Sequence, residues 1–113
     1  NNKFEESIAL TYYSMYHMLI ALFFKIGIKC ENHTASIMIL KEIFNINNSD
    51  ILSAKKERID KQYYTNFNIT KQEVIEAIKT AEEFNKKILD FISKLNNNNI
   101  EFYKEKFKKL IKE

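Results

Sequence analysis

The segment that constrains this chain most strongly is KFEESIALTYYSMYHMLIALFFKIG, residues 3–27. Apolar side chains recur along it at the three- and four-residue spacing of an α-helix, at Phe4, Ile8, Met15, Leu19, Leu22 and Ile26. Tyrosine, isoleucine and phenylalanine fill its other sides, and a helix that is apolar nearly all round needs neighbours on several faces. Gly27 follows directly, where a left-handed residue commonly ends a helix. We therefore expect a central helix over about residues 3–26.

The composition favours helices in the rest of the chain as well. The 113 residues include no proline, one glycine and one cysteine. This composition argues against most β folds, whose tight turns need glycine and proline, and against a disulfide framework or cysteine zinc site. Glycine-rich phosphate loops are also excluded. A chain of this length forms one domain, so we expect a single all-α, reduced, cytoplasmic domain over residues 1–113.

Four further helices are expected, at about residues 34–44, 50–63, 70–95 and 100–112. The third of the five helices can be capped by Asn48 or Ser49. The fourth begins at Thr70-Lys71-Gln72-Glu73, where the Thr70 hydroxyl and the Glu73 carboxylate can satisfy each other's free backbone N–H groups. The run Asn96–Asn99 separates the last two. The expected fold is an antiparallel bundle of four to five helices joined by short loops.

The longest apolar stretch, residues 8–28, is interrupted by polar side chains. Thr11, Ser14, His17 and Lys25 all lie within it. We therefore interpret it as a buried core helix rather than a membrane span or a signal peptide, and expect no membrane partner.

Few residues are available for chemistry. The chain has two histidines, His17 and His33, which lie sixteen residues apart and match no metal-ligand spacing, so we expect no metal and no cofactor. Either histidine can be a packed structural residue or part of a site. Cys30 lacks the surroundings that activate a thiol, and a nucleophilic role is not favoured.

Arg58 is the only arginine among eighteen basic residues. Its planar guanidinium is suited to bidentate contact with a phosphate or a carboxylate. Lys61, Tyr63 and Tyr64 follow closely, and basic side chains beside aromatic rings can bind and stack a nucleotide. In the alternative interpretation Arg58 pairs with Glu57, Asp60 or an acid on another helix, and the tyrosines simply close the bundle.

Four short motifs resemble one family. The stretch Leu10–Leu19, LTYYSMYHML, resembles the "AYYAMFHA" helix of small stand-alone prokaryotic HEPN proteins (higher eukaryote and prokaryote nucleotide-binding). Asn32-His33-Thr34 resembles that family's "K-T-H-S" helix start. Arg58 with Tyr63 resembles "R-x-x-A-D-Y", and the segment 81–84 resembles the "A-x-x-F" of the last core helix. The resemblance extends over about residues 4–95.

This resemblance implies a bundle of four or five helices that commonly dimerises and binds nucleotides or RNA. Many members are metal-independent ribonucleases, often toxins paired with a minimal nucleotidyltransferase antitoxin, and use an Arg-x4-6-His motif. Arg58 matches the arginine, but Tyr63 stands where a histidine is expected, and no histidine follows His33. The catalytic residues therefore remain unassigned and ribonuclease activity is in doubt, although His17 or His33 can approach Arg58 in the fold or across a dimer.

The resemblance also implies a helix before residue 3, so we interpret the chain as a HEPN-like domain that lacks the family's first helix. Apolar surface exposed in this way can be covered by self-association or by the segment 100–112. We expect a domain that binds nucleotide or RNA as one component of a toxin–antitoxin or defence system. The alternative is a non-catalytic homodimeric scaffold. The expected binding residues are His17, His33, Arg58, Lys61, Tyr63 and Tyr64.

Overall fold

The computed structural model describes residues 2–63 and 68–112, except for the side chains of residues 2 and 60–63. Over these ranges the chain forms five helices and no strand. They are α1 (Asn2–Ile26), α2 (His33–Glu42), α3 (Ser49–Tyr63), α4 (Lys71–Ser93) and α5 (Asn97–Lys112). The expected all-α bundle is confirmed.

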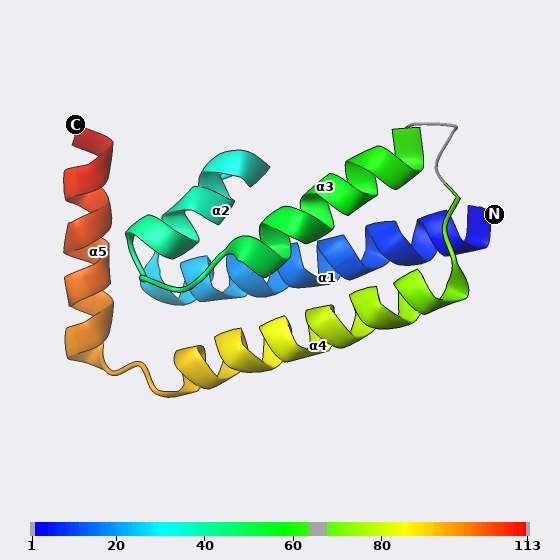
Figure 1. Cartoon of the computed structure of the whole chain (residues 1–113). Helices are drawn as coiled ribbons and strands as arrows, with labels where there is room; N and C mark the ends of the chain where they lie inside the picture. The colour runs from blue at the N-terminus through cyan, green and yellow to red at the C-terminus, as the bar shows by residue number, and fades with distance from the viewer. Residues whose placement is uncertain (1, 64–67, 113) are drawn as a thin grey trace.

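α1 is the central helix and contacts all four others. α1 and α4 lie side by side and run in the same direction, whereas α3 runs the opposite way along α1 (Figure 1). α5 stands across the end of the bundle where α1 and α4 finish. The α1 side chains Tyr12, Leu19 and Leu22 are completely buried. The apolar character of the helix on several faces follows from this central position.

Two helix ends agree with the sequence pattern. Gly27 has a φ of 96°, and the N–H groups of Gly27 and Ile28 both donate to the Phe23 carbonyl, which ends α1. At the start of α4 the Thr70 hydroxyl accepts from the Glu73 N–H at 3.1 Å, and the Glu73 carboxylate accepts from the Thr70 N–H at 3.1 Å. The capping box is confirmed.

Two other starts differ from expectation. At α3 the Asn48 side chain donates to the Ile37 carbonyl, and the N–H of Ser49 donates to the Asn47 side chain. The Asn48 side chain therefore joins the start of α3 to α2 instead of forming the expected cap, and Asn47 accepts the N–H of the first residue of α3. α5 begins at Asn97, three residues earlier than expected, because the Asn96 and Asn99 side chains each accept the other's backbone N–H.

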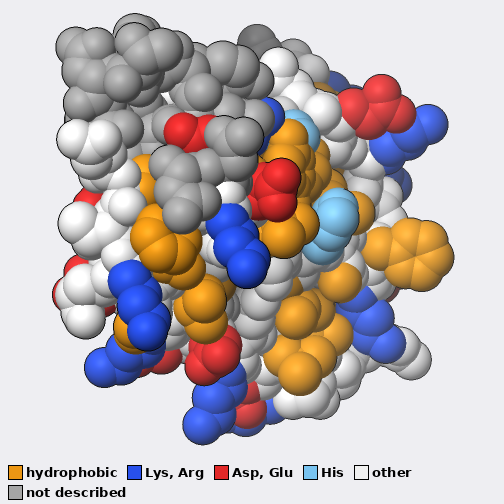
Figure 2. Space-filling view, turned by 90° about the vertical axis from the view of Figure 1, so that its right-hand side faces the viewer, with side chains coloured by type: hydrophobic (Ala, Val, Ile, Leu, Met, Phe, Trp, Pro, Cys, Tyr) orange, Lys and Arg blue, Asp and Glu red, His pale blue; other side chains and the backbone are white. Residues whose placement is uncertain are grey.

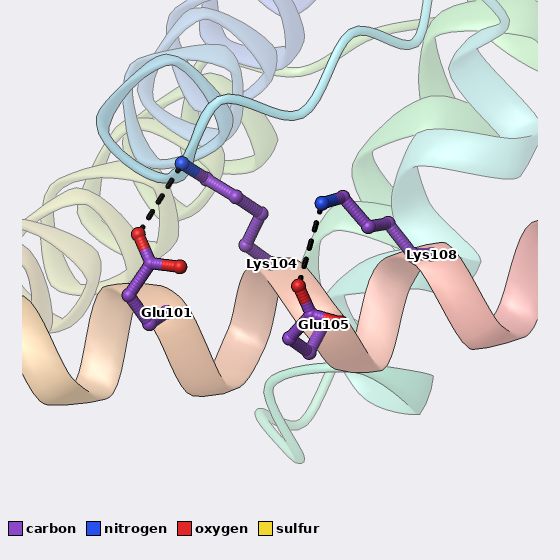
Figure 3. Close-up of polar contacts among 4 residues, drawn as sticks. All are labelled: Glu101, Lys104, Glu105 and Lys108. Atoms are coloured by element: carbon purple, nitrogen blue, oxygen red, sulfur yellow. Dashed lines mark hydrogen bonds and ion pairs between the residues drawn. The ribbon is translucent and has the colours of Figure 1, made fainter.

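α5 packs through only part of its surface. The Tyr103 ring lies 4.8 Å from the Phe44 ring and 5.9 Å from the Phe91 ring, measured between centroids. The Lys106 ammonium donates to the Ile43 carbonyl at 3.0 Å. Elsewhere α5 carries exposed ion pairs within its own turns, Lys104–Glu101 and Lys108–Glu105 (Figure 3). Such pairs contribute only a few tenths of a kcal/mol, so the aromatic contact is what holds α5 in place.

Lys3–Ile26 in α1 is long and apolar enough, by length and composition alone, to cross a membrane. No other helix in the described ranges meets that test. The buried core helix of a soluble protein passes it too, and α1 packs its apolar face against α3 and α4.

Candidate functional site

Three helices bring aromatic and basic side chains together near the middle of α1. Tyr12 and Tyr13 are adjacent on α1, and Tyr16 lies one turn further along it. His33 is the first residue of α2, and Arg58 comes from α3. We call these five residues the Arg58 site. The histidines are visible on one face of the molecule among hydrophobic side chains (Figure 2).

Arg58 lies against the tyrosine rings. Its Cζ atom is 4.9 Å from the centroid of Tyr13 and 5.8 Å from that of Tyr12, distances at which a cation is attracted to the face of an aromatic ring. Its Nε atom is buried and has no hydrogen-bond acceptor. The internal ion pair with Glu57, the alternative interpretation of this arginine, does not form, and Arg58 is in none of the ion pairs formed within the described part of the chain. The Asp60 side chain lies outside the described residues.

His33 is held in place from two sides. Its ring stacks on Tyr16 at a centroid distance of 3.8 Å and an angle of 18°. Its Nδ1 atom lies 2.8 Å from the Tyr12 hydroxyl. The preceding residue, Asn32, caps α2 by accepting from the Ala35 N–H. Because Asn32 caps α2, the side chain of His33 is not needed for the cap, and its imidazole packs against α1.

The surroundings of His33 favour its neutral form. Burial, then the positive charges of Arg58 and Lys55, then His17, hold its pKa below the usual 6.5. Burial also raises the pKa of Tyr12 to about 12. At neutral pH the Tyr12 hydroxyl therefore stays protonated. When it donates to Nδ1 of His33, the hydrogen of the imidazole is on Nε2.

The region around Arg58 is positively charged. His17 lies one turn along α1 from Tyr13, with ring centroids 6.5 Å apart, and its side chain is exposed. Lys55 lies one turn before Arg58 on α3 and acts electrostatically on His33. A group that carries negative charge is attracted to such a cluster of cations.

An open depression of about 600 Å³ adjoins the site. Tyr16 and His33 form one side of it, and Ile20 and Phe23 are among its other lining residues. Apolar and aromatic walls of this kind suit a flat ring system. The site therefore combines cations with an aromatic surface large enough for a nucleobase.

The structure brings together part of the predicted binding set. His33 and Arg58 contact the same tyrosines, and His17 lies beside them. The side chains of Lys61 and Tyr63, at the end of α3, and the whole of Tyr64 lie outside the described residues. Their predicted roles remain predictions.

Sequence reasoning missed the aromatic floor of the site. Tyr12, Tyr13 and Tyr16 had been interpreted only as filling the sides of the central helix. One signal is present in the motif LTYYSMYHML: all three tyrosines precede His17 within five residues, and Tyr13 is one helical turn from it. The hydroxyl of a buried tyrosine usually forms a hydrogen bond with a polar group. For Tyr12 that group is His33.

The described residues include no group of three or more histidine, cysteine, aspartate or glutamate side chains able to hold a metal ion. What the Arg58 site offers chemically is a planar cation, a neutral imidazole and stacked rings. Its arrangement can attract a phosphate and place an aromatic base beside it.

Comparison with known proteins gives one match. A family model described as the HEPN domain matches residues 1–94, which include α1 to α4 and the whole Arg58 site. No curated protein and no solved structure matches the chain significantly. α5 lies beyond the matched residues.

Proposed function

The chain belongs to the HEPN domain family, and from that premise we propose that the Arg58 site binds nucleotide or single-stranded RNA. Arg58 contacts the phosphate, and the ring surface around Tyr16 and His33 receives a base. Members of this family are often concerned with nucleotides or RNA, which agrees with the chemistry of the site.

The observation that carries this proposal is that the Arg58 guanidinium forms no ion pair with any carboxylate of the described residues. An arginine confined against aromatic rings loses hydration, and its Nε atom is buried without an acceptor. A purely structural arginine at such a place is normally paired with a carboxylate or a carbonyl. Here Tyr12 and Tyr13 lie against the guanidinium, and we propose that its Nη donors contact the two oxygens of a phosphate.

The experiment is a fluorescence anisotropy titration of labelled single-stranded RNA, with a parallel ATP titration, at low salt. We expect binding that weakens as salt rises, because phosphate contacts release counterions. Arg58→Gln raises Kd at least about tenfold, as expected for the loss of a charge-assisted contact of about 1.5–3 kcal/mol.

The matched control is Lys94→Gln, which removes one positive charge at the exposed residue that follows α4 and pairs with Asp90. It leaves Kd within about twofold, because surface charges contribute little. The absence of binding of either ligand at low salt, or equal effects of the two variants, would reject the proposal.

We further propose that the protein acts as one component of a toxin–antitoxin or defence system, with a small nucleotidyltransferase as its partner. The support is family membership, and a nucleotidyltransferase gene adjacent to this one is the expected context. Co-purification of the two products as a stoichiometric complex tests this. If the two purified products stay separate in size-exclusion chromatography, the pairing is wrong.

Metal-independent cleavage of RNA is a second candidate, favoured by the placement of a neutral imidazole next to an arginine. In the tautomer whose Nδ1–H donates to the Tyr12 hydroxyl, Nε2 of His33 can accept the proton of a ribose 2′-hydroxyl. The 2′-oxygen then bonds to the adjacent phosphorus, the P–O5′ bond breaks, the 5′-oxygen takes a proton from water, and Arg58 neutralises the charge that develops on the phosphate. Cleavage should persist in EDTA and be lost in both His33→Ala and Arg58→Gln. Cleavage that is unchanged in these variants would come from a contaminating nuclease.

A further inference from the structure

The hydroxyl of Tyr12 is enclosed by the protein. Tyr12 is completely buried, so its hydroxyl has no contact with bulk water. Among the described residues its one hydrogen-bond partner is Nδ1 of His33, at a distance of 2.8 Å. A single hydrogen therefore lies between the two atoms, and it is bonded either to the tyrosine oxygen or to the imidazole nitrogen. Which atom carries this hydrogen determines the chemistry that His33 can perform.

The two arrangements differ in whether a buried donor lacks an acceptor. If Nδ1 of His33 carries the hydrogen, the Tyr12 hydroxyl keeps a hydrogen of its own, because burial keeps the phenol protonated. No described residue accepts that second hydrogen, and a buried donor without an acceptor loses its full hydration. If the Tyr12 hydroxyl donates to Nδ1, every hydrogen in the contact has an acceptor. The second arrangement is therefore favoured, and it places the imidazole hydrogen on Nε2.

The other ring nitrogen of His33 is not used by the fold. One face of the imidazole is stacked on Tyr16, and its Nδ1 edge is held by Tyr12. Nε2 is on a different edge of the ring, and no described residue forms a hydrogen bond with it. His33 is only partly buried and lines the open depression beside the site. The Nε2–H group is therefore a donor that a ligand can reach.

Arg58 contacts the same tyrosines as His33. Its Cζ atom lies 4.9 Å from the ring centroid of Tyr13, and the His33 ring meets Tyr13 edge-on with the centroids 6.3 Å apart. Burial, and then the positive charge of Arg58, oppose the addition of a second proton to His33 and so lower its pKa. A neutral donor is therefore present next to a permanent cation. A phosphate has several acceptor oxygens and can accept from both groups.

We propose that Tyr12 is a positioning residue: its hydroxyl fixes His33 in the Nε2–H form, and this N–H donates to the phosphate that Arg58 binds. The inference rests on the proposed binding of nucleotide or RNA, and it adds a neutral donor and the residue that sets it. Cleavage with His33 as the base needs a lone pair on Nε2, so it uses the less populated form. The arrangement therefore favours binding over cleavage.

The first test determines the tautomer of His33 in the free protein, without RNA. Long-range ¹H–¹⁵N spectra at pH 7.5 distinguish the protonated nitrogen of a neutral imidazole from the bare one, and a His17→Gln variant assigns the His33 signals. We expect the hydrogen on Nε2, with this form exceeding the other at least about fivefold because the other leaves a buried hydroxyl without an acceptor. A hydrogen on Nδ1 in the wild type overturns the proposal.

Two tyrosine variants test the role of Tyr12 in the same spectra. Tyr12→Phe removes the hydroxyl and keeps the ring, so the two nitrogen shifts of His33 should move toward each other as the two forms become closer in population. Tyr13→Phe is the matched control, because Tyr13 meets His33 through its ring, and it leaves both shifts in place. Circular dichroism checks that both variants are folded. Equal changes in the two variants, or no change in Tyr12→Phe, would show that Tyr12 does not set the form of His33.

The second test uses labelled single-stranded RNA and separates a neutral donor from a charge. His33→Gln keeps an N–H donor in the side chain and should hold Kd within about threefold, whereas His33→Leu removes the donor and should raise Kd at least about fivefold. Both variants leave the salt dependence of Kd unchanged. Arg58→Gln should reduce the slope of log Kd against log salt by about 0.7, the value for one phosphate contact on a single strand.

The outcomes of the RNA titrations are distinct. Equal weakening in His33→Gln and His33→Leu, or a reduced salt slope in His33→Leu, would show that the His33 donor does not act as proposed. A protein that binds no RNA at all rejects the phosphate contact together with the proposed function. The spectra of the free protein then still decide whether Tyr12 fixes the form of His33.

Discussion

Two side chains, Arg58 and His33, determine the character of the site. Arg58 is the only arginine in the chain, and two tyrosines hold it where no described carboxylate reaches it. His33 is fixed by Tyr16 and Tyr12 and kept neutral by burial and by nearby cations. A permanently charged donor and a neutral imidazole are therefore present side by side at pH 7.

The His33 titration is the first prediction at this scale. The chain has only two histidines, so their imidazole NMR signals can be assigned with a His17→Gln variant. We expect His33 to titrate below 6.5, because burial and then Arg58 lower its pKa. Arg58→Gln should raise the pKa of His33, but not to 6.5, because burial of the imidazole still lowers it. A wild-type midpoint at or above 6.5 would show that the surroundings of His33 are wrongly described.

The same shift makes stability depend on pH. Because the pKa of His33 is lower in the folded state than in the unfolded state, the unfolded state binds more protons between those two values. The contribution of His33 to the stability therefore decreases as the pH drops below 6.5. It becomes constant once the pH is below the pKa of His33 in the folded state. Urea unfolding of wild type and His33→Gln across pH 5–7.5 measures this effect: the stability of the wild type relative to the variant should fall as the pH drops below 6.5 and should be constant above about pH 7. A wild type that became more stable relative to the variant as the pH fell would have the wrong sign.

Residue roles were only partly predictable from sequence. The scarcity of arginine and histidine pointed to Arg58, His17 and His33, which do lie near one another. The part played by Tyr12 was hidden, because a tyrosine on a central helix fits core packing equally well. Only the fold shows that its hydroxyl meets His33, since that contact joins residues 21 positions apart.

At the scale of elements, all five helices could be predicted from apolar spacing and caps, because those signals are local. The ends of α1 and the start of α4 agree with them. The starts of α3 and α5 differ because asparagines have several possible partners. Asn48 bonds to α2, and Asn96 pairs with Asn99. The partner of each asparagine side chain depends on which residues lie near it in the fold, and the order of residues along the chain does not specify this.

The docking of α5 gives a prediction at this scale. Tyr103→Ala removes the ring that packs against Phe44 and Phe91, and should lower the free energy of unfolding by about 2 kcal/mol, less than for a fully buried aromatic residue. Phe102→Ala, the exposed neighbour, should change it by less than about 0.5 kcal/mol. Chemical denaturation of both variants makes the comparison. Equal effects would mean that α5 is not held by Tyr103.

At the scale of the whole molecule, different faces of α1 form different surfaces. One face forms the core with α3 and α4, and the adjoining tyrosines form the floor of the Arg58 site. A third face, which carries Leu10, His17 and Phe24, is exposed. The relative placement of these surfaces could not be predicted, because it requires the parallel arrangement of α1 and α4 (Figure 1).

The central claim is that Arg58 binds the phosphate of a nucleotide or RNA, and the most direct measurement follows its own Nε–H signal. With one arginine in the chain, a ¹H–¹⁵N spectrum of the wild type contains a single such side-chain resonance. Titration with a short single-stranded RNA should shift this resonance in a saturable manner at low salt, with the same Kd as anisotropy. If RNA binds and the Arg58 Nε–H signal does not move, the phosphate is held elsewhere and the claim is wrong.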